Sequence, residues 1–310
     1  MLSLLQASSY AAFAIFVLVV LWRAIKYATM PIHLRWELYP VPHEPEHEHG
    51  GSFFEEQEFW KKPRKHDKLN ELKEMFEEML FIKRVYQNKR GMWYFSWPFH
   101  GGIYLILAWF ALMFIKAVLI LAGLSEGSIL VIIADYLILL TGIVGILAAT
   151  FGCLGLLALR LSNKDLRKYS SGVDYFNLVF ILVVLLTGWV AWLGFDPTFD
   201  TAKAYMLSLV SFGGVDMPAL SGATLVHMIL LELLFVYIPF TKMSHYIGKY
   251  FTYHCVLWED EINLRGSEVE RRVKEALKLR ARWSAPHFSG RTWGEEVKNP
   301  KLDVIERWKP

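Results

Sequence analysis

Long apolar runs alternate with polar segments along this chain. A helix needs about 20 apolar residues to cross the ~30 Å hydrocarbon core of a bilayer, and each run reaches that length. The charges well inside these runs are Lys116 in the second, Asp135 in the third and Glu232 in the fifth. The pattern predicts five transmembrane helices, at about residues 2–22, 98–122, 129–159, 174–195 and 221–244.

The composition agrees with a membrane protein. Apolar residues make up 54% of the 310, aromatic residues 15%, and the mean hydropathy is +0.30, a combination that soluble domains rarely show. We expect an all-α membrane protein, with a five-helix bundle over residues 1–247 and a cytoplasmic tail over 248–310. The first run is too long for a signal peptide and no small-residue cleavage site follows it, so we expect an uncleaved anchor.

The loop charges predict the orientation. Basic residues gather after the first run, after the third run and in the C-terminal tail, whereas the loops at 122–128 and 196–218 are acidic except for Lys203. By the positive-inside rule, the N-terminus lies outside the cell membrane, and the loop 29–97 and the C-terminus lie in the cytoplasm. The net charge of +3 is spread over membrane-flanking loops, so it indicates no nucleic-acid site.

Three polar or mixed segments suggest elements outside the spans. In "DKLNELKEMFEEMLFIKRVYQ" apolar residues recur at helical spacing opposite charges, which predicts an amphipathic cytoplasmic helix. The tail segment "GSEVERRVKEALKLRARW" predicts a second one. The apolar stretch 204–212 is too short to span, and we interpret it as a lid-like or re-entrant segment on the outer face.

Cysteine and most of the histidines suggest no metal site. Cys153 and Cys255 are too few and too far apart in sequence for an iron–sulfur cluster or a zinc site. The histidines of "HEPEHEH", within 43–49, alternate with glutamate in a hydrophilic loop, which is only a weak signal for metal binding. We expect these side chains to be solvated.

Three histidines lie at or within the apolar runs: His100 at the start of the second, and His227 and His245 towards the ends of the fifth. A polar side chain in a span is costly and by default functional, and neutral histidine is a good axial ligand of haem iron. His227 and His245 are 18 residues apart, which is about 27 Å and five turns of one helix, so they mark two levels on one face. His100 and His245 then reach the same cytoplasmic leaflet from antiparallel helices, and one b-type haem fits between them.

Several stretches of the chain, two of them around these histidines, and its five-span layout resemble the membrane cytochrome b family typified by the gamma subunit of respiratory nitrate reductase. More narrowly, the chain is similar to the haem b subunits of heterodisulfide-reductase-like menaquinol-oxidising complexes of sulfate reducers. The stretches are "PFHGGIYLILAW", "TLVHMILLELLFVYIPFTKMSHY", "MPIHLRWELYPVPHE" and "SGRTWGEE". The glycines beside His100, Gly101 and Gly102, would let a porphyrin approach the backbone.

The resemblance implies a subunit that passes electrons between menaquinol and cytoplasmic iron–sulfur proteins through haem b. It implies that His100 and His245 bind the haem nearer the cytoplasm, and that His227 is one ligand of an outer haem. Where the family places a second histidine for that outer haem, this chain has Phe110. Met113 lies one turn beyond Phe110, and its thioether is another candidate ligand. Two accounts stay open: one haem with a quinone site near His227, or a second haem held by His227 and another ligand.

The charges inside the spans offer proton acceptors for quinol oxidation, which releases two protons with two electrons. Lys116 and Asp135 lie at similar depths near the outer face, so an ion pair would offset part of their burial penalty. Glu232 lies five residues inward of His227, about 140° around the helix and near the bilayer centre. With His227, these three residues are the candidate quinone and proton-transfer groups.

Three function classes follow. We favour a haem b electron-transfer subunit of anaerobic respiration, active only in complex with a heterodisulfide-reductase-like iron–sulfur subunit and with room for further membrane or periplasmic cytochrome subunits. A transporter or channel would use Lys116, Asp135 and Glu232 as a polar path, but neither the discontinuous helices nor the inverted repeats typical of transporters are evident in the sequence. A cofactor-free membrane anchor is the third class.

Overall fold

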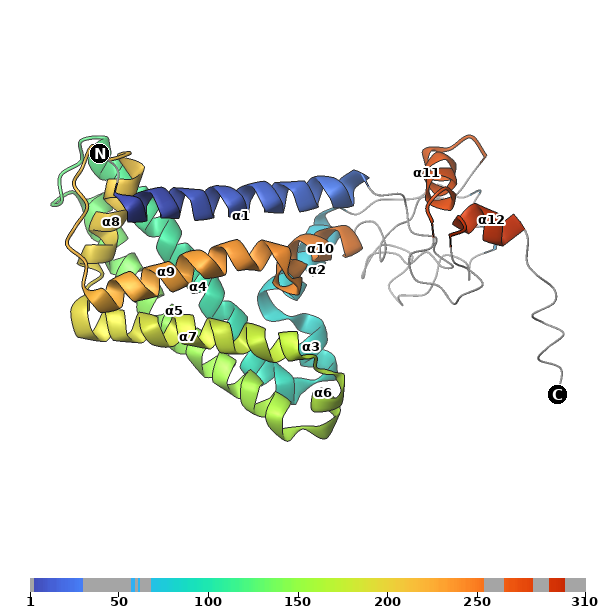
Figure 1. The fold of residues 1–310 in the computed structure, drawn as a ribbon, viewed down its shortest axis with the longest axis horizontal. Helices are drawn as coiled ribbons and strands as arrows, with labels where there is room; N and C mark the ends of the chain where they lie inside the picture. Colours follow the sequence, from blue (N-terminus) through green and yellow to red (C-terminus); the bar gives the residue numbers. More distant parts are fainter. Residues whose placement is uncertain are drawn as a thin grey trace. The chain divides into compact units, whose positions relative to one another are not determined.

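The computed structural model describes residues 3–29, 57–58, 61, 68–253, 265–280 and 290–298, and the regular elements in these ranges are helices (Figure 1). Five of them are long and apolar enough to cross a membrane, which confirms the all-α, five-helix prediction. They are α1 (Leu4–Thr29), α4 (Arg90–Leu121), α5 (Ile129–Ser162), α7 (Gly172–Phe195) and α9 (Gly222–Tyr237), the last continued by a 3₁₀ turn, η3 (Ile238–Phe240). The orientation of the termini stays a prediction.

Large apolar side chains are exposed on all five helices, as at Leu18, Phe114, Leu140, Leu186 and Leu233. An apolar surface of this extent would drive aggregation in water, but it matches the hydrocarbon of a bilayer. The exposed faces therefore support a multi-pass membrane protein.

Shorter helices connect and flank the spans. They are α2 (Lys68–Phe81), α3 (Lys83–Asn88), α6 (Lys164–Tyr169), α8 (Asp200–Val210), η4 (Lys242–Ser244), α10 (His245–Thr252), α11 (Glu268–Leu277) and α12 (Trp293–Lys298). Helices α2 and α11 confirm the two amphipathic segments as helical. Helix α8 shows that the short apolar stretch in the loop after α7 is helical too.

The chain forms two compact units. The first comprises Met1–Leu21 and Phe76–Ser244, and so holds most of the apolar helices; the second comprises Trp22–Met75 and His245–Pro310. Within the second unit, the rings of Tyr27 and Phe251 lie 5.9 Å apart. The predicted boundary at residue 247 stays a prediction.

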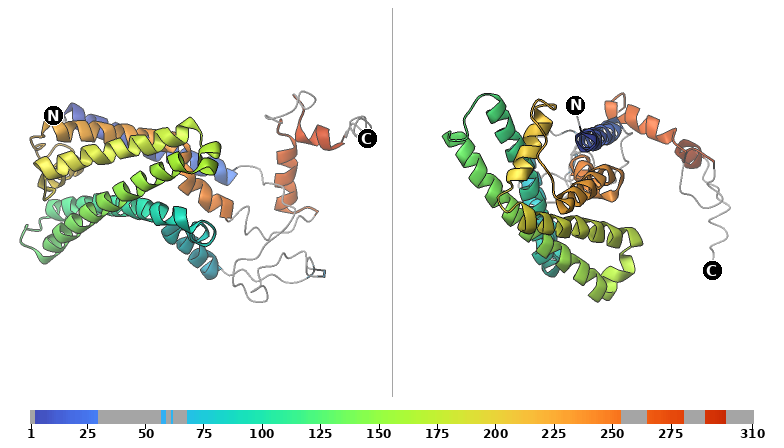
Figure 2. Two further views of the ribbon diagram at one scale, coloured as in Figure 1. Left: turned by 90° about the horizontal axis from the view of Figure 1, so that it is seen from below. Right: turned by 60° about the vertical axis from the view of Figure 1, so that its left-hand side comes forward.

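Helices α4 and α5 of the first unit pack along each other through glycine (Figure 2). A Cβ atom on Gly102 would lie 2.3 Å from the backbone nitrogen of Ala149, and one on Gly152 would lie 2.4 Å from the backbone nitrogen of Phe99. The two backbones can therefore meet only because these side chains are missing. Close approach through small residues is the usual means of packing helices in lipid, where hiding apolar surface from hydrocarbon gains nothing.

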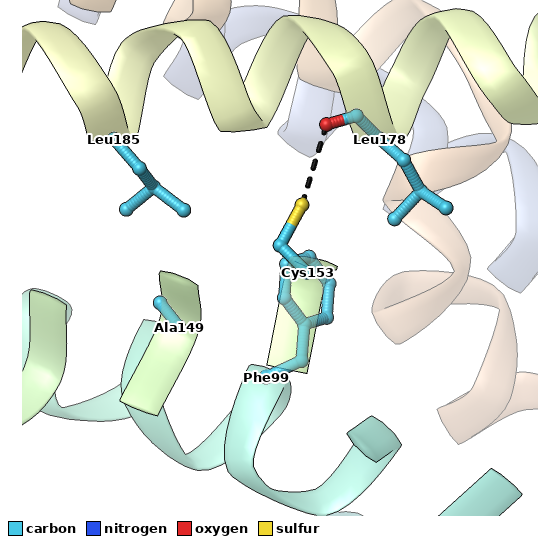
Figure 3. Packing of buried hydrophobic residues seen from close by; sticks show 5 residues of the cluster. All are labelled: Phe99, Ala149, Cys153, Leu178 and Leu185. Carbon is cyan, nitrogen blue, oxygen red and sulfur yellow. Dashed lines mark hydrogen bonds between the residues drawn. The ribbon is translucent and has the colours of Figure 1, made fainter. Parts of the chain in front are cut away.

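Helix α7 closes over the same contact. Five residues are buried together: Phe99 from α4, Ala149 and Cys153 from α5, and Leu178 and Leu185 from α7 (Figure 3). The Cys153 thiol donates to the carbonyl oxygen of Leu178 at 3.3 Å. This thiol therefore serves the packing of α5 against α7.

The C-terminal end of α2 is held by side chains of α4. Trp93 and Trp97 donate their indole N–H groups to the carbonyl oxygens of the last two residues of α2, at 2.7 and 3.1 Å. Tyr104 donates its hydroxyl to the carbonyl oxygen of the residue before them, at 2.8 Å. The last carbonyls of a helix have no partner within it, so these three bonds satisfy groups that would otherwise need water.

The fifth predicted span is not one continuous α-helix. Helix α9 ends at Tyr237, and two 3₁₀ turns separated by an extended Thr241 lead to α10. Pro239 accounts for the break, because proline has no N–H to donate and its ring clashes with the preceding turn. The expectation of five unbroken turns between His227 and His245 is therefore wrong, and their shared face does not follow from the spacing.

We expect Gly152→Ala to destabilise the protein and Gly194→Ala to leave it unchanged or stabilise it. Both glycines are helical, but a Cβ on Gly152 meets the α4 backbone, whereas one on Gly194 meets no described atom within 4 Å. Forced overpacking costs about 1–3 kcal/mol, while alanine in place of an unhindered helical glycine gains up to about 1 kcal/mol. Thermal unfolding of both variants in detergent measures the difference, and equal midpoints would contradict the close α4–α5 contact.

Candidate functional site

His100 lies about three turns into α4, after its aromatic start, and its side chain is half-buried. Its Nδ1 lies 2.7 Å from the carbonyl oxygen of Ser96. A carbonyl oxygen only accepts, so Nδ1 carries the proton and Nε2 of the neutral ring carries the lone pair. A backbone carbonyl that fixes the tautomer in this way is the usual support of a metal-binding histidine.

The surroundings of His100 on α4 combine aromatic donors and one open glycine. Trp97, His100 and Tyr104 recur at intervals of three and four residues, so they share the face that holds the end of α2. Gly102 does not serve a porphyrin as expected, because it is taken up by the contact with α5. A Cβ on Gly101 would meet no described atom within 4 Å, so only this glycine keeps the predicted role.

His245 is the first residue of α10 and is exposed, between the buried Ser244 and the nearby buried Ile247. It belongs to the second compact unit, whereas His100 belongs to the first. Their pairing across one haem therefore stays a prediction.

His227 of α9 packs against α7. The Thr187 hydroxyl has a single proton, which it donates to the carbonyl oxygens of Val183 or Val184 at 3.0 and 2.9 Å. The same oxygen lies 3.2 Å from Nδ1 of His227; when the hydroxyl proton goes to a valine carbonyl, Nδ1 is the donor and Nε2 carries the lone pair. A Cβ on Gly188 would lie 3.0 Å from Cε1 of this ring, so the absent side chain makes room for the imidazole.

Phe110 and the candidate ligand Met113 are both used in packing. The ring of Phe110 lies 4.9 Å from that of Trp109 and 6.2 Å from that of Phe235. Met113 is buried with Ile138 and the partly buried residues around them, including Phe110 itself. These contacts give Phe110 and Met113 a structural role in the apolar core.

Lys116 and Asp135 form the predicted ion pair. The ammonium nitrogen of Lys116 lies 2.8 Å from both carboxylate oxygens of Asp135. Lys203 of α8 lies 2.9 Å from the same carboxylate and 2.8 Å from Asp200, and Lys116 also lies 3.1 Å from Glu126. The cluster therefore binds α4, α5 and α8 together.

The place of Lys203 in this cluster was not predicted, although Lys203 is the one basic residue of two acidic loops. Burial opposes its charge, but hydrogen bonds to Asp200 and Asp135 outweigh burial and raise the pKa of Lys203. The Lys203 ammonium, with the Thr198 hydroxyl, lowers the pKa of Asp200 in turn. Opposite charges thus keep each other ionised at neutral pH.

Glu232 faces α1, not the α7 side where His227 packs. Its carboxylate accepts a hydrogen bond from the Ser9 hydroxyl, and the Ser9 oxygen lies 3.0 Å from the hydroxyl oxygen of Tyr205 in α8. This agrees with the expectation that Glu232 and His227 lie on different faces of α9.

Ser9, the α1 partner of Glu232, belongs to a polar strip that the apolar pattern did not predict. Gln6 donates to the hydroxyl oxygen of Ser208 at 3.2 Å, and Tyr10 donates to the carbonyl oxygen of Leu209 at 2.6 Å. With Ser9, these residues face α8 from the N-terminal half of α1. The signal in the sequence was a set of polar residues, with Ser9 and Tyr10 three and four positions after Gln6, within an apolar run.

Other predicted features lie outside the described residues. These are the histidine-rich loop 43–49 and Cys255. Their expected roles stay predictions.

Comparison with known proteins relates the chain to one family. A family model described as nitrate reductase gamma subunit matches residues 84–259, more than half of the 310 residues. The matched segment includes His100, His227 and His245. The comparison with curated proteins and the comparison with solved structures gave no match.

We expect Asp135→Asn to destabilise the protein by on the order of 2 kcal/mol. Removing one partner of a fully buried ion pair costs about 3–5 kcal/mol, and the partial exposure of Asp135 reduces this cost. The side chains of Lys116 and Lys203, only 11% and 13% exposed, would lose their shared carboxylate. Asp216→Asn, the same change at an exposed position after α8, is the control. Equal thermal unfolding midpoints for the two variants would show that the cluster does not hold α8.

Proposed function

Because the chain belongs to the nitrate reductase gamma subunit family, we propose that it is the haem b subunit of a respiratory complex that exchanges electrons between menaquinol and a cytoplasmic iron–sulfur partner. Members of this family are haem-binding, cytochrome b-type membrane subunits that interact with quinol and work with catalytic subunits. The observation that carries the proposal is the family match over the segment that holds all three candidate histidines.

His100 and His245 are the proposed axial ligands of the haem. The fixed tautomer of His100, with Nε2 as the unprotonated nitrogen, and the open Gly101 beside it support this assignment. Bound between the two imidazoles, haem b would supply a one-electron carrier within the membrane. The Ser96 carbonyl would hold the His100 ring in its orientation.

His227 is proposed to bind the quinol, and the account with one haem is preferred. Its Nε2 has a lone pair that can accept a proton from a quinol hydroxyl, while Thr187 holds Nδ1. The packing of Phe110 and Met113 supports this account, since both side chains serve the apolar core. A second haem would need another ligand for His227.

The complex is proposed to lie in the cytoplasmic membrane, with a heterodisulfide-reductase-like iron–sulfur subunit on the cytoplasmic face. The amphipathic helix α2 and the charged helix α11 are suitable docking elements for that partner. The chain has only two cysteines, so the clusters would come from the partner, and activity would require the complex. Further membrane or periplasmic cytochrome subunits fit the same scheme.

The transporter alternative is less well supported. It needs Lys116 and Asp135 as a polar path, but both are held in the ion cluster with α8. A cofactor-free anchor would have the same fold as the cytochrome and would differ from it by the absence of haem absorption bands.

We expect the purified protein to show b-type absorption bands after dithionite reduction, with one haem per chain by pyridine haemochrome. His100→Ala and His245→Ala should each abolish the bands, because a bis-imidazole site loses one of its two ligands. His227→Ala, a histidine change in another span, is the control and should keep them. A colourless wild-type preparation would support the anchor, and loss of half the haem in His227→Ala would support two haems.

We also expect His227→Ala to slow haem reduction by a soluble menaquinol analogue by about 10²-fold, a common effect of losing a general base. Thr187→Val, which removes only the hydroxyl that orients the ring, should have a smaller effect. Stopped-flow absorbance measures both rates. An unchanged rate in His227→Ala would exclude this histidine from the quinol site.

A further inference from the structure

We propose that Glu232, Ser9 and Tyr205 form a hydrogen-bonded proton path from the interior of the membrane to helix α8. The inference rests on the proposed function, because it supplies the exit for protons released by quinol oxidation. It assigns a role to α1, which otherwise looks like a plain anchor, and to α8.

The path consists of three side chains from three helices of the first unit. Glu232 comes from the middle of α9, Ser9 from the second turn of α1 and Tyr205 from α8. Ser9 bonds to both neighbours: it donates to the Glu232 carboxylate, and its oxygen lies 3.0 Å from the Tyr205 hydroxyl. A single serine thus joins a carboxylate inside the bundle to the helix that follows α7.

The surroundings of Glu232 make an idle carboxylate costly. Phe235, one turn further along α9, has its ring 5.4 Å from that of Phe16 and 6.2 Å from that of Phe110. A carboxylate within an apolar span is costly and is by default functional. The bond to Ser9 gives Glu232 a route by which to lose a proton.

Each proton transfer along the path has a donor and an acceptor. Quinol gives up two electrons and two protons as it becomes quinone; the electrons pass through the haem to the iron–sulfur partner, one proton goes to Nε2 of His227 and the other to the Glu232 carboxylate. Protonated Glu232 donates to the Ser9 oxygen, Ser9 donates to the Tyr205 oxygen, and the Tyr205 proton passes on to water at the α8 end. Rotation of the two hydroxyls then restores the starting bonds.

Tyr205 is suited to relay a proton without ionising. It is 6% exposed, and burial raises its pKa; the Ser9 hydrogen bond lowers it in part, and the Glu232 charge raises it further. The hydroxyl therefore stays protonated at neutral pH. Lys203, two residues earlier in α8, is bound to Asp135, so the ion cluster positions Tyr205 and does not itself carry the proton.

The competing explanation is that Ser9 and Glu232 only hold α1 to α9. Polar contacts of this kind do join membrane helices. The two explanations differ in one measurable respect: a lost proton path can be replaced by a small diffusible acid, whereas a lost packing contact cannot.

The test compares three variants with matched controls in the full-length, haem-loaded chain. Glu232→Gln, Ser9→Ala and Tyr205→Phe each remove one proton-carrying group with little change of volume. The controls are Ser8→Ala, whose hydroxyl donates to the Leu5 carbonyl oxygen within α1, and Tyr10→Phe, whose hydroxyl donates to Leu209. Haem reduction by a soluble menaquinol analogue is followed by stopped-flow absorbance, with and without millimolar acetic acid.

We expect the three path variants to slow haem reduction by about 10- to 100-fold, and acetic acid to restore much of the rate. Ser9→Thr, which keeps the hydroxyl, should react like wild type, as should both controls. Rates equal to those of the controls, or a loss that acetic acid does not restore, would overturn the proton path. Haem content and monodispersity identify any variant that fails to fold. In that case the test is whether Ser9→Thr, which keeps the hydroxyl, reduces haem faster than Ser9→Ala, which lacks it. A wild-type chain without b-type bands would instead overturn the proposed function, and the path with it.

Discussion

The close contact between the α4 and α5 backbones is the interaction on which the rest of the bundle depends. In lipid, apolar side chains gain nothing from leaving the solvent, so helices associate through van der Waals contact and polar bonds. Gly102 and Gly152 bring the two backbones together, and α7 then packs over Phe99 and Cys153 on the same seam. The contact also sets the direction of His100, since Gly102 two residues later must face α5.

Polar bonds complete what glycine begins. Helix α8 is tied to α4 and α5 by the carboxylate of Asp135, and to α1 by hydrogen bonds from Gln6 and Tyr10. Each bond lies between partners that would be costly to leave alone in hydrocarbon. The polar groups described here fall into two sets for the same reason. In the ion cluster around Asp135 each charge has a partner of opposite charge, whereas Glu232 is bonded to the hydroxyls of Ser9 and, through it, Tyr205.

Sequence patterns anticipated the parts that depend on composition and missed those that depend on contact. The five spans follow from run length, and the Lys116–Asp135 pair follows from matched depth. The end of α9 could have been foreseen from Pro239, but the surrounding apolar residues gave the impression of one continuous span. Nothing in the spacing shows that Gly102 meets Ala149, or that Ser9 reaches Glu232 from a distant segment, because both contacts depend on how separate helices are arranged. The pairing of His100 with His245 rests on the predicted directions of the spans and on resemblance, and it stays a prediction.

The aromatic clasp on α2 has a mechanical consequence. Trp93, Trp97 and Tyr104 grip consecutive carbonyls at the end of that helix, and His100 lies on the same stripe of α4, between the second and the third of them. A displacement of the end of α2 would therefore move the turn of α4 that carries His100. A partner that binds α2 and displaces it would therefore also change the orientation of the His100 ring.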